Sequence, residues 1–323
     1  MILEGVIIVA FALLLDFLVG DPRTKYHPTA WIGKLIASLV PFAKSNSAKR
    51  ELIGGILIVS IIVATVCTAL VVLDIGISLL TVDIVSLVVS IAVSSILLKT
   101  TIAIRGMQKH ALAVVDAVEK GDLVSARNHL SMIVKRDTKH LDKNHILSAV
   151  LESVSENTVD GVTGPLFYYA IFGLPGAFVY RAINTIDSMI GYKTTLFKNV
   201  GWFGAKCDTV LNYAPSRLTG LVMILSALIL GYNWKESLYI MRRDSRKLES
   251  PNAGFPMAAL AGALGTRLEK MNYYTIGNGS TEFTKSHIIS AVTLMKFSSI
   301  LFFGMITIPI IMTLSFLGWW IHA

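Results

Sequence analysis

Long apolar runs are the feature that most restricts how this chain can fold. A helix rises about 1.5 Å per residue, so roughly 20 apolar residues cross a hydrocarbon core about 30 Å thick. Only 15% of the 323 residues are charged and the mean hydropathy is +0.64, whereas a soluble domain carries about 25% charged residues. Six runs have the length and composition of a span: 2–19, 52–73, 77–98, 162–183, 215–232 and 297–321. The sequence therefore predicts an all-α polytopic membrane protein with about four to six membrane helices.

Basic residues collect between these runs on one side of the expected bilayer. The formal charge is +8, which would also suit a nucleic-acid-binding protein. However, segments 20–51, 99–161 and 233–293 hold most of the 29 lysines and arginines, and cytoplasmic loops of membrane proteins carry such an excess. We therefore expect a multi-pass protein of the cell membrane with these segments on the cytoplasmic side, and no nucleic-acid partner.

The chain is treated as a single membrane-embedded domain, 1–323, because no internal repeat or low-complexity tract divides it. It carries a polar helical insertion at about 99–161 and a polar segment at about 233–293. Within the insertion, Asp122 is a candidate N-cap of an amphipathic helix. A further helix is expected from about 142 to 157. If that helix continues, Glu152, Glu156 and Asp160 share one face.

Four polar blocks lie beside the apolar runs. They read DFLVGDPRTKYHP, ESVSENTVDG, YRAINTIDSMIGY continued by AKCDTVLNYAPSR, and SPNAGFPMAALAGALG. An ionisable group at membrane depth costs several kcal/mol unless it is paired or hydrated. We expect the following groups to converge or to line a polar cavity, with structural ion pairs or interfacial anchoring as the alternative for any one of them: Asp16, Arg181, Asp187 and Arg217.

The residue types in these blocks indicate phosphate chemistry at a membrane face. Carboxylates with neighbouring asparagines suit magnesium, which prefers hard oxygen ligands shared with phosphates. Arginine grips phosphate oxygens bidentately. The chain has no P-loop, no H-E-x-x-H and no G-x-S-x-G motif, which argues against the enzyme classes that those motifs mark.

At these blocks the sequence closely resembles the CobD/CbiB family of cobalamin biosynthesis, the adenosylcobinamide-phosphate synthases. The resemblance rests on DFLVGDPRTKYHPTAWIG, SMIVKRDT, the long block from ESVSENTVDG to NTIDSMIGY, FGAKCDTVLNYAPSRLTG and SPNAGFPMAALAGALG. These blocks occur in family order and span residues 16–265.

The resemblance implies an integral membrane ligase that joins adenosylcobyric acid to an amino alcohol phosphate, typically aminopropanol phosphate. The family reaction forms an amide bond, is described as ATP-dependent and yields adenosylcobinamide phosphate. A carboxylate is a poor acyl donor, so ATP would convert it to an acyl phosphate, while Mg²⁺ and arginine offset charge on the transferred phosphoryl group. ATP and Mg²⁺ are thus implied, together with the bilayer and other membrane enzymes of late cobalamin synthesis as partners.

We assign site roles as hypotheses. The candidate catalytic residues are Asp16, Asp21, His27 and Asp187. The candidate residues for binding ATP phosphates or substrate are Glu156, Asn157, Asp160, Arg181, Asn184, Asp208, Asn212, Arg217 and Asn252. The candidate magnesium ligands are Glu156, Asp160 and Asp187. Small residues after Asn252 would let backbone approach the flat corrin ring.

A topology with six crossings conflicts with the proposed site, whose residues must all reach ATP. Six crossings place 184–214 outside, away from ATP and from the basic segments. The alternative is that 162–183 and 215–232 are re-entrant, because Gly164-Pro165 and the GLPG sequence at 173–176 interrupt the first of them, and irregular backbone at membrane depth is tolerated inside protein. The active site would then lie on the cytoplasmic side.

Two other functions remain open at this stage. Broken helices with Asp and Arg at membrane depth also occur in transporters of anionic substrates, which here would include a corrinoid. A scaffold for corrinoid enzymes without catalysis of its own is the other alternative.

Overall fold

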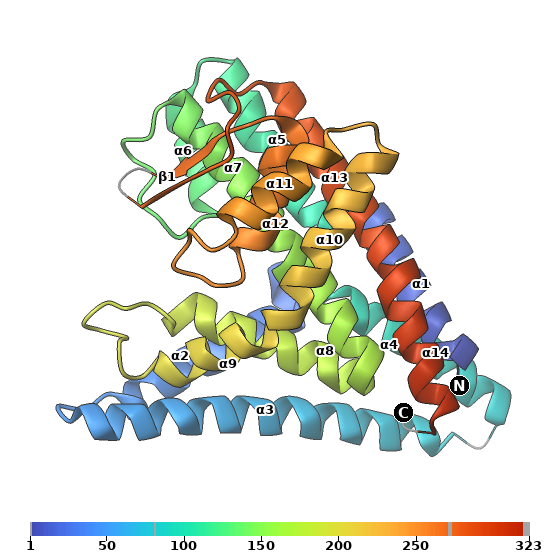
Figure 1. Cartoon of the computed structure of the whole chain (residues 1–323). Helices are drawn as coiled ribbons and strands as arrows, with labels where there is room; N and C mark the ends of the chain where they lie inside the picture. Colours follow the sequence, from blue (N-terminus) through green and yellow to red (C-terminus); the bar gives the residue numbers. More distant parts are fainter. Residues whose placement is uncertain (1, 81, 271–272, 319–323) are drawn as a thin grey trace. The chain divides into compact units, whose positions relative to one another are not determined.

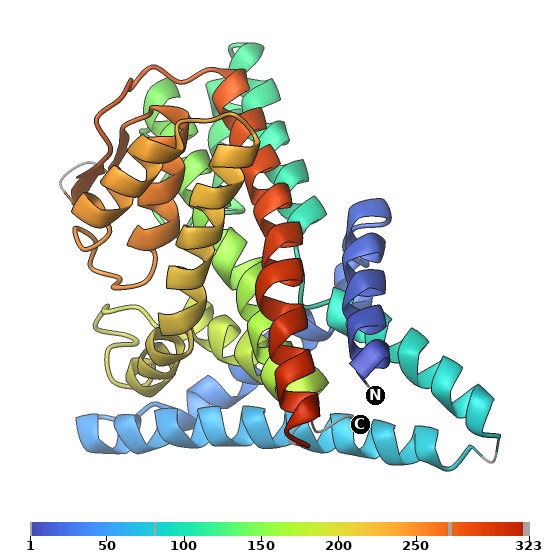
Figure 2. The same cartoon turned by 45° about the vertical axis from the view of Figure 1, so that its right-hand side comes forward.

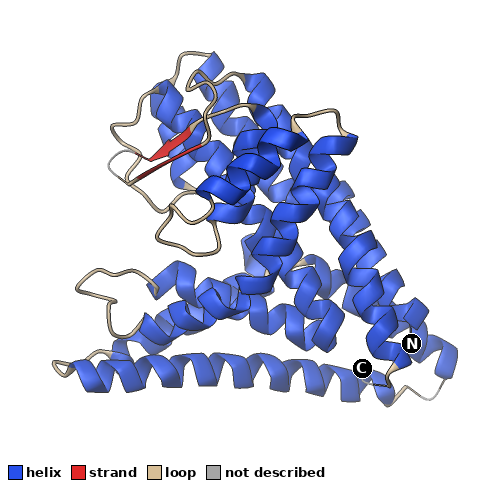
Figure 3. Cartoon of the chain, in the orientation of Figure 1, coloured by secondary structure: helices blue, strands red, loops and turns tan. Residues whose placement is uncertain are grey.

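The computed structural model describes residues 2–80, 82–270 and 273–318. Helices dominate, and the strands within these residues are one antiparallel pair, β1 (Leu268–Lys270) and β2 (Tyr274–Ile276) (Figure 3). Four helical stretches are long and apolar enough to cross a membrane: Ala48–Ser78, Asp83–Glu119, Lys143–Ile190 and Lys285–Phe316. The expected all-α polytopic fold is confirmed.

The six predicted runs correspond to helices of two lengths. Runs 52–73, 77–98, 162–183 and 297–321 fall in the four long stretches, although 319–321 lie outside the described residues. The other two runs form 17-residue helices, α1 (Ile2–Leu18) and α10 (Tyr213–Ile229), which is the short limit for crossing.

The chain folds into two compact units. Unit 1 comprises Met1–Ile102, Gly164–Leu211 and Met305–Ala323, and unit 2 comprises Ala103–Thr163 and Asn212–Gly304. The two polar segments predicted at 99–161 and 233–293 therefore fall almost wholly in unit 2.

Unit 1 is organised along one long helix, α3, which Figures 1 and 2 both show unbroken. Its helices are α1, α2 (Pro28–Ala43), α3 (Ala48–Ser78), α4 (Asp83–Lys99), α8 (Gly164–Ile190), α9 (Trp202–Leu211) and α14 (Ile308–Phe316), with a 3-10 turn at Thr24–Tyr26. Apolar side chains of α2, α3 and α8 form its core, among them Ile36, Ile58, Ile62, Phe178 and Ile186.

The boundary between the second and third predicted runs is shifted. Ile77 belongs to α3, because the α3 hydrogen-bond ladder continues through Leu79, whose N–H donates to the Ile75 carbonyl at 3.2 Å. The next helix begins only at Asp83, where a carboxylate is favoured by the positive end of the helix dipole.

α8 is a helical hairpin with its bend at Gly173. That residue has φ 64° and ψ −154°, a conformation essentially confined to glycine. A Cβ on Gly176 would lie 2.3 Å from the Tyr168 carbonyl oxygen, and one on Gly164 would lie 2.2 Å from the Tyr180 ring. In a straight helix, Gly164 and Tyr180 would be roughly 24 Å apart. The two halves therefore run antiparallel.

The second half of α8 returns along α3 to the N-terminal end of that helix. Near the bend, Leu174 shares a cavity with Leu70. Beyond the end of α8, Asn199 Nδ2 donates to Glu51 Oε2 at 3.0 Å. A Cβ on Gly55 would lie 2.1 Å from the Val200 carbonyl oxygen, so glycine is required for this close approach.

This geometry bears on the conflict over 184–214. Residues 162–183 do not form one continuous helix, because the chain reverses at Gly173. Residues 196–200 and the end of the basic segment, 44–51, meet at the same end of α3. The reversal agrees with the re-entrant alternative for 162–183, and re-entrance of this run and of 215–232 stays a prediction.

Unit 2 surrounds one central helix, α7. It contains α5 (Ile104–Glu119), α6 (Leu123–Ser131), α7 (Lys143–Thr158), α10, α11 (Trp234–Asp244), α12 (Gly254–Leu264), α13 (Lys285–Phe302) and the strand pair. α7 packs against α5, α6, α12, α13 and β1 (Figure 1). Polar as well as apolar positions of α7 are buried, because neighbours cover it on several sides.

Local signals set the helix ends in unit 2. The Asp122 carboxylate accepts from the Ser125 N–H, and the Asp142 carboxylate accepts from the His145 N–H, both at 2.9 Å. These contacts confirm the predicted N-cap of α6 and the predicted start of α7. α6 ends at Ser131, earlier than its apolar pattern extends.

Two π-helical turns interrupt the helical runs, Val159–Thr163 after α7 and Phe303–Thr307 between α13 and α14. In the first, Thr163 Oγ1 donates to the Thr158 carbonyl at 3.1 Å. A π turn inserts an extra residue and rotates the side chains that follow, and such turns often occur at functional sites.

Candidate functional site

The end of α1 and the end of α4 form a charged cluster in unit 1. Asp16 is fully buried. Lys99 Nζ lies 3.7 Å from Asp16 Oδ1 and 2.9 Å from Asp21 Oδ1, and His27 Nε2 lies 3.8 Å from the same Asp21 oxygen. Three of the predicted catalytic residues thus share one cluster. The lysine supplies the positive charge without which a buried Asp16 carboxylate would be strongly destabilising.

The cluster favours the ionised form of Asp21. Burial acts to raise the pKa of this carboxyl, but hydrogen bonds and charge from His27 and Lys99 outweigh burial and hold the pKa below its ordinary value. Asp21 is therefore a carboxylate at neutral pH. It can orient an imidazole or an ammonium group.

A second group of predicted residues joins α8 to α9 in the same unit. Arg181 Nη1 donates to Asn184 Oδ1 at 3.4 Å, and Asn184 Nδ2 donates to Asp208 Oδ1 at 3.3 Å. Asp187 follows one turn after Asn184 and is half-buried. A Cβ on Gly204 would lie 2.5 Å from Ile186, so the absent side chain lets α9 approach α8 one turn before Asp208.

In unit 2, Glu152 is a structural carboxylate. It is 6% exposed. Its oxygens accept from Arg136 Nη2 at 2.9 Å, Tyr274 Oη at 2.8 Å and Ser148 Oγ at 2.9 Å. Burial and the nearby Glu152 raise the pKa of the Tyr274 hydroxyl, so Tyr274 remains a donor. These bonds fasten the strand pair to α7.

The carboxylates that follow Glu152 do not share its surroundings. Glu156 is exposed and Asp160 is half-buried, and Asp160 falls inside the π-helical turn. The condition for one acidic face, a continued α-helix, is therefore not met. Asn157 Nδ2 donates to the Ser153 carbonyl at 2.9 Å.

Arg217 is held between two aromatic rings at the start of α10. Its guanidinium carbon lies 3.5 Å from the Tyr213 ring centroid and 4.4 Å from that of Phe255. Nη1 donates to the Tyr213 carbonyl at 2.7 Å and to Asn252 Oδ1 at 3.2 Å. Within the described residues, Arg217 forms no ion pair with a carboxylate. The guanidinium is thus fixed in orientation while its charge is not neutralised.

The N-terminus of α12 lies beside this arginine, because Asn252 and Phe255 belong to the loop and first turn of that helix. Ser250 Oγ accepts from the Ala253 N–H at 3.3 Å, which shapes the loop. Helix N-termini and arginines both favour anions. Asn212, the remaining predicted residue, is buried at the N-cap of α10.

No group of three or more His, Cys, Asp and Glu side chains is arranged to hold a metal ion in the part of the chain that the structure describes. The proposed ligands Glu156 and Asp160 belong to unit 2 and Asp187 belongs to unit 1, so this ligand set stays a prediction.

Three functional candidates were missed in the sequence. Lys99 follows a predicted span directly, where a lysine is ordinarily an interfacial anchor. Tyr213 precedes Arg217 by one helical turn, and that spacing was an available signal for ring–guanidinium contact. Phe255 comes from a distant segment, so no local pattern could have identified it.

Comparison with known proteins agrees with the sequence blocks. The profile described as CobD/Cbib protein matches residues 9–295. The chain belongs to the CobD/CbiB family. The matched region contains every residue that was proposed for the site.

Curated relatives of this family align along nearly the whole chain. A probable cobalamin biosynthesis protein CobD of Methanothermobacter thermautotrophicus is 39% identical over 300 residues, which cover 93% of this chain and 96% of the relative. Cobalamin biosynthesis protein CobD of Leptospira interrogans is 40% identical over 304 residues, covering 91% and 94%. The CobD of Clostridium perfringens is 38% identical over 309 residues, covering 92% and 95%. No solved structure matches the chain.

Proposed function

We propose that this CobD/CbiB protein joins adenosylcobyric acid to an amino alcohol phosphate in cobalamin biosynthesis. The reaction forms an amide bond at the expense of ATP and gives adenosylcobinamide phosphate. Support comes from family membership over residues 9–295 and from relatives named as cobalamin biosynthesis proteins. The amine substrate is typically aminopropanol phosphate.

The observation that best supports phosphate chemistry is the arginine clamp, defined as Arg217 with Tyr213, Phe255 and Asn252. Two rings fix the plane of the guanidinium, and no described carboxylate neutralises it. A planar, oriented guanidinium grips phosphate through two parallel hydrogen bonds. We assign the clamp to a phosphate of ATP or of the amino alcohol phosphate.

We propose that a magnesium ion arrives with the nucleotide phosphates and is not held by a preformed protein cage. Magnesium is usually held by one or two carboxylates together with phosphate oxygens and water, so a protein cage of three or more acidic groups is not required. In unit 2, Glu156 and Asp160 would supply carboxylates to the ion, with Asn157 as a neutral oxygen donor, and in unit 1 Asp187 is the candidate carboxylate. The ion would offset charge on the transferred phosphoryl group.

The attacking amine must lose a proton as the amide bond forms. In our proposal the cluster of Asp16, Asp21, His27 and Lys99 binds and orients this amine. Imidazole is the group in the cluster suited to proton transfer near neutral pH. Asp21, kept ionised by Lys99, would orient His27, and Asp16 would hold Lys99 in place.

The clusters are proposed to act on the cytoplasmic side of the cell membrane. ATP is available there, and cytoplasmic loops carry the excess of basic residues. In unit 1, residues 196–200 and 44–51 lie at one end of α3, which suits this assignment. A membrane enzyme that uses the product remains our proposed partner.

A transporter is not favoured. The relatives are named as biosynthesis proteins, and the polar clusters of unit 1 lie at helix ends, as the contacts of Asp16 with Lys99 and of Glu51 with Asn199 illustrate.

The test is turnover by purified protein in lipid nanodiscs. Adenosylcobyric acid, aminopropanol phosphate, ATP and magnesium are supplied, and corrinoid mass is followed by chromatography. We expect product from the natural chain, with large losses in Arg217→Ala and Asp187→Ala at unchanged melting temperature. Arg242→Ala is the matched control, because Arg242 is an exposed arginine of the same unit as the clamp.

Two results would contradict the proposal. Product formation that does not depend on ATP would exclude the amide-ligase mechanism. Uptake of corrinoid into liposomes by folded protein, without any product, would support transport instead.

A further inference from the structure

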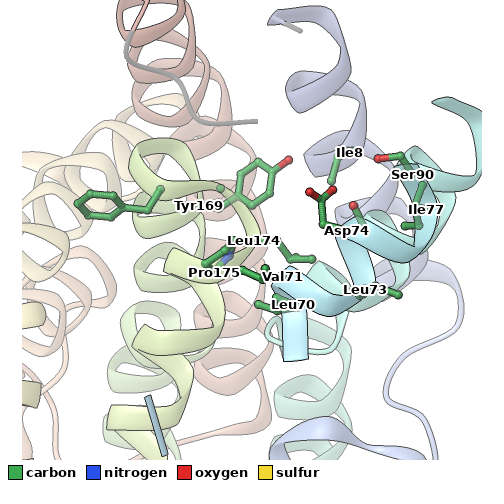
Figure 4. A pocket seen from close by; sticks show the side chains of 13 residues that line it. Ile8, Leu70, Val71, Leu73, Asp74, Ile77, Ser90, Tyr169, Leu174 and Pro175 are labelled. Carbon is green, nitrogen blue, oxygen red and sulfur yellow. The ribbon is translucent and has the colours of Figure 1, made fainter. Parts of the chain in front are cut away.

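A cavity of about 250 Å³ lies in unit 1 at the bend of the α8 hairpin (Figure 4). Helices α1, α3, α4 and α8 contribute its walls, which are mainly apolar side chains such as Ile8, Leu70 and Leu174. The bend at Gly173 and Pro175 forms part of the lining. None of the residues proposed for the catalytic site lines this cavity.

Three polar side chains of α3 and α4 line the same space: Asp74, Ser90 and Ser94. Figure 4 shows the Asp74 carboxylate pointing toward the space between Ile8 and Tyr169, with Ser90 on its other side. Among the described residues that line the cavity there is no lysine or arginine. Its electrostatic character is therefore set by one carboxylate.

These polar groups are not used by the fold. Other hydroxyls of the same helices donate to the preceding turn, as Thr65 does to the Ile61 carbonyl at 2.7 Å and Ser95 does to the Ile91 carbonyl at 2.6 Å. Within the described residues, Ser90 and Ser94 make no such side-chain bond, and Asp74 makes neither a hydrogen bond nor an ion pair. A half-buried carboxylate without a partner in an apolar site is costly unless a ligand or water compensates it.

The position of Asp74 along α3 sets its depth. α3 has 31 residues and is roughly 46 Å long, longer than the hydrocarbon core of about 30 Å. Lys49 and Arg50 lie at its first turn, the end assigned to the cytoplasmic side by the excess of basic residues. Asp74 lies one turn from the opposite end, which our proposal places at the level of the outer headgroups.

We propose that this cavity binds the primary ammonium group of an aminophospholipid from the outer leaflet. A primary ammonium carries one positive charge and three N–H donors, which match one carboxylate and two hydroxyl groups. Val71 and Val88, 53% and 60% exposed, lie on the lipid-facing surfaces of α3 and α4, along which acyl chains would lie. A choline head has no N–H donor, and an anionic head would be repelled by Asp74.

The experiment is native mass spectrometry of the purified full chain after equilibration in nanodiscs with equal amounts of phosphatidylethanolamine, phosphatidylcholine and phosphatidylglycerol. We expect the ethanolamine lipid to be retained about tenfold over the choline lipid, equivalent to about 1.4 kcal/mol. The preference should disappear in Asp74→Asn. It should persist in Asp83→Asn, which removes a nearby carboxylate that does not line the cavity.

Further variants make the result independent of the charge change. Ser94→Leu fills the cavity and should also abolish retention, with the melting temperature unchanged in detergent. Equal retention of ethanolamine and choline lipids by the natural chain would overturn the proposal, as would full retention by Asp74→Asn. Displacement of the lipid by low concentrations of soluble ethanolamine would overturn the lipid assignment. It would indicate that the site binds a free amine.

Discussion

The charged cluster of unit 1 and the arginine clamp of unit 2 solve opposite electrostatic problems. In the cluster, two carboxylates share Lys99, at 3.7 and 2.9 Å, so charge is balanced within the protein. In the clamp, neutral rings and a neutral amide hold Arg217, and no described carboxylate pairs with it. A balanced cluster depends on each partner for stability, whereas an unbalanced cation is available to an anionic ligand.

The comparison predicts different consequences of mutation. Removing one partner of the cluster leaves a buried charge uncompensated, so the main expected effect is a lower free energy of unfolding. Removing the arginine of the clamp takes away a charge that the fold does not need, so the main expected effect is weaker binding of the anionic ligand.

The largest expected effect is the all-or-none accessibility of introduced cysteines from the two sides of the membrane. It tests on which side each end of α3 lies. In a chain without its two cysteines, Ser45→Cys and Thr195→Cys should react with a membrane-impermeant maleimide from the same side. Both sites lie at the N-terminal end of α3, where Lys44 donates to the Leu196 carbonyl. Val82→Cys, between α3 and α4, should react only from the opposite side. Labelling of Thr195→Cys together with Val82→Cys would refute the hairpin.

The next largest effect concerns the partner of Asp16. Lys99→Met leaves a carboxylate of 0% exposure without its cation, and such a change costs about 3–5 kcal/mol. Denaturant unfolding in detergent measures this loss. Lys34→Met, at an exposed lysine of the same unit, should have little effect. Asp16→Asn combined with Lys99→Met should recover part of the loss, because both charges are then removed. Additive losses in the double variant would contradict a direct pair.

For the arginine clamp we expect the opposite: a large loss of substrate binding and a small loss of stability. Arg217→Lys keeps the charge but loses the planar contact with Tyr213 and Phe255, so we expect at least a tenfold rise in KM for the phosphate-bearing substrate that the clamp binds, roughly the value of one bidentate contact. Unfolding free energy should fall by less than about 2 kcal/mol, the sum of two cation–π contacts. A fall in stability as large as that of Lys99→Met would abolish the distinction between the two regions.

The smallest effect is the pH dependence of the cluster. The pKa of Asp21 is lower in the folded protein than its ordinary value, so its contribution to stability is fully present above the unfolded pKa, about 3.9. That contribution is lost as pH falls through the folded pKa. Because the group is partly exposed, the difference between the natural chain and Asp21→Asn should be below about 1 kcal/mol at pH 6. It should shrink as pH falls below the unfolded pKa, and a difference independent of pH would contradict the assignment.

Much of the fold was accessible from pattern alone. The apolar runs predicted the long helices because burial in lipid demands continuous hydrophobicity, and Asp122 and Asp142 marked helix starts through local hydrogen bonds. The GLPG sequence predicted a break. The pattern could not decide between a kinked crossing and a reversal, because both need a glycine at that position.

The site was accessible only in part. Spacing suggested that Glu152 belongs with Glu156 and Asp160, but Arg136 and Tyr274 hold Glu152 in the core. Tyr274 comes from a segment far away in the sequence, which no local pattern reveals. The same spacing took no account of the π-helical turn at Asp160, which sequence periodicity does not reveal.

The sequence by itself determined that this is a helical membrane protein of the CobD/CbiB family, because hydrophobicity, helix caps and motif blocks are properties of neighbouring residues. Only the tertiary structure decided which side chains contact one another and where the chain reverses. Lys99 reaches Asp16 and Asp21, Arg217 enters between Tyr213 and Phe255, and α8 folds back at Gly173. These outcomes depend on long-range packing, in which the energy of a polar group is set by the neighbours that the fold brings to it.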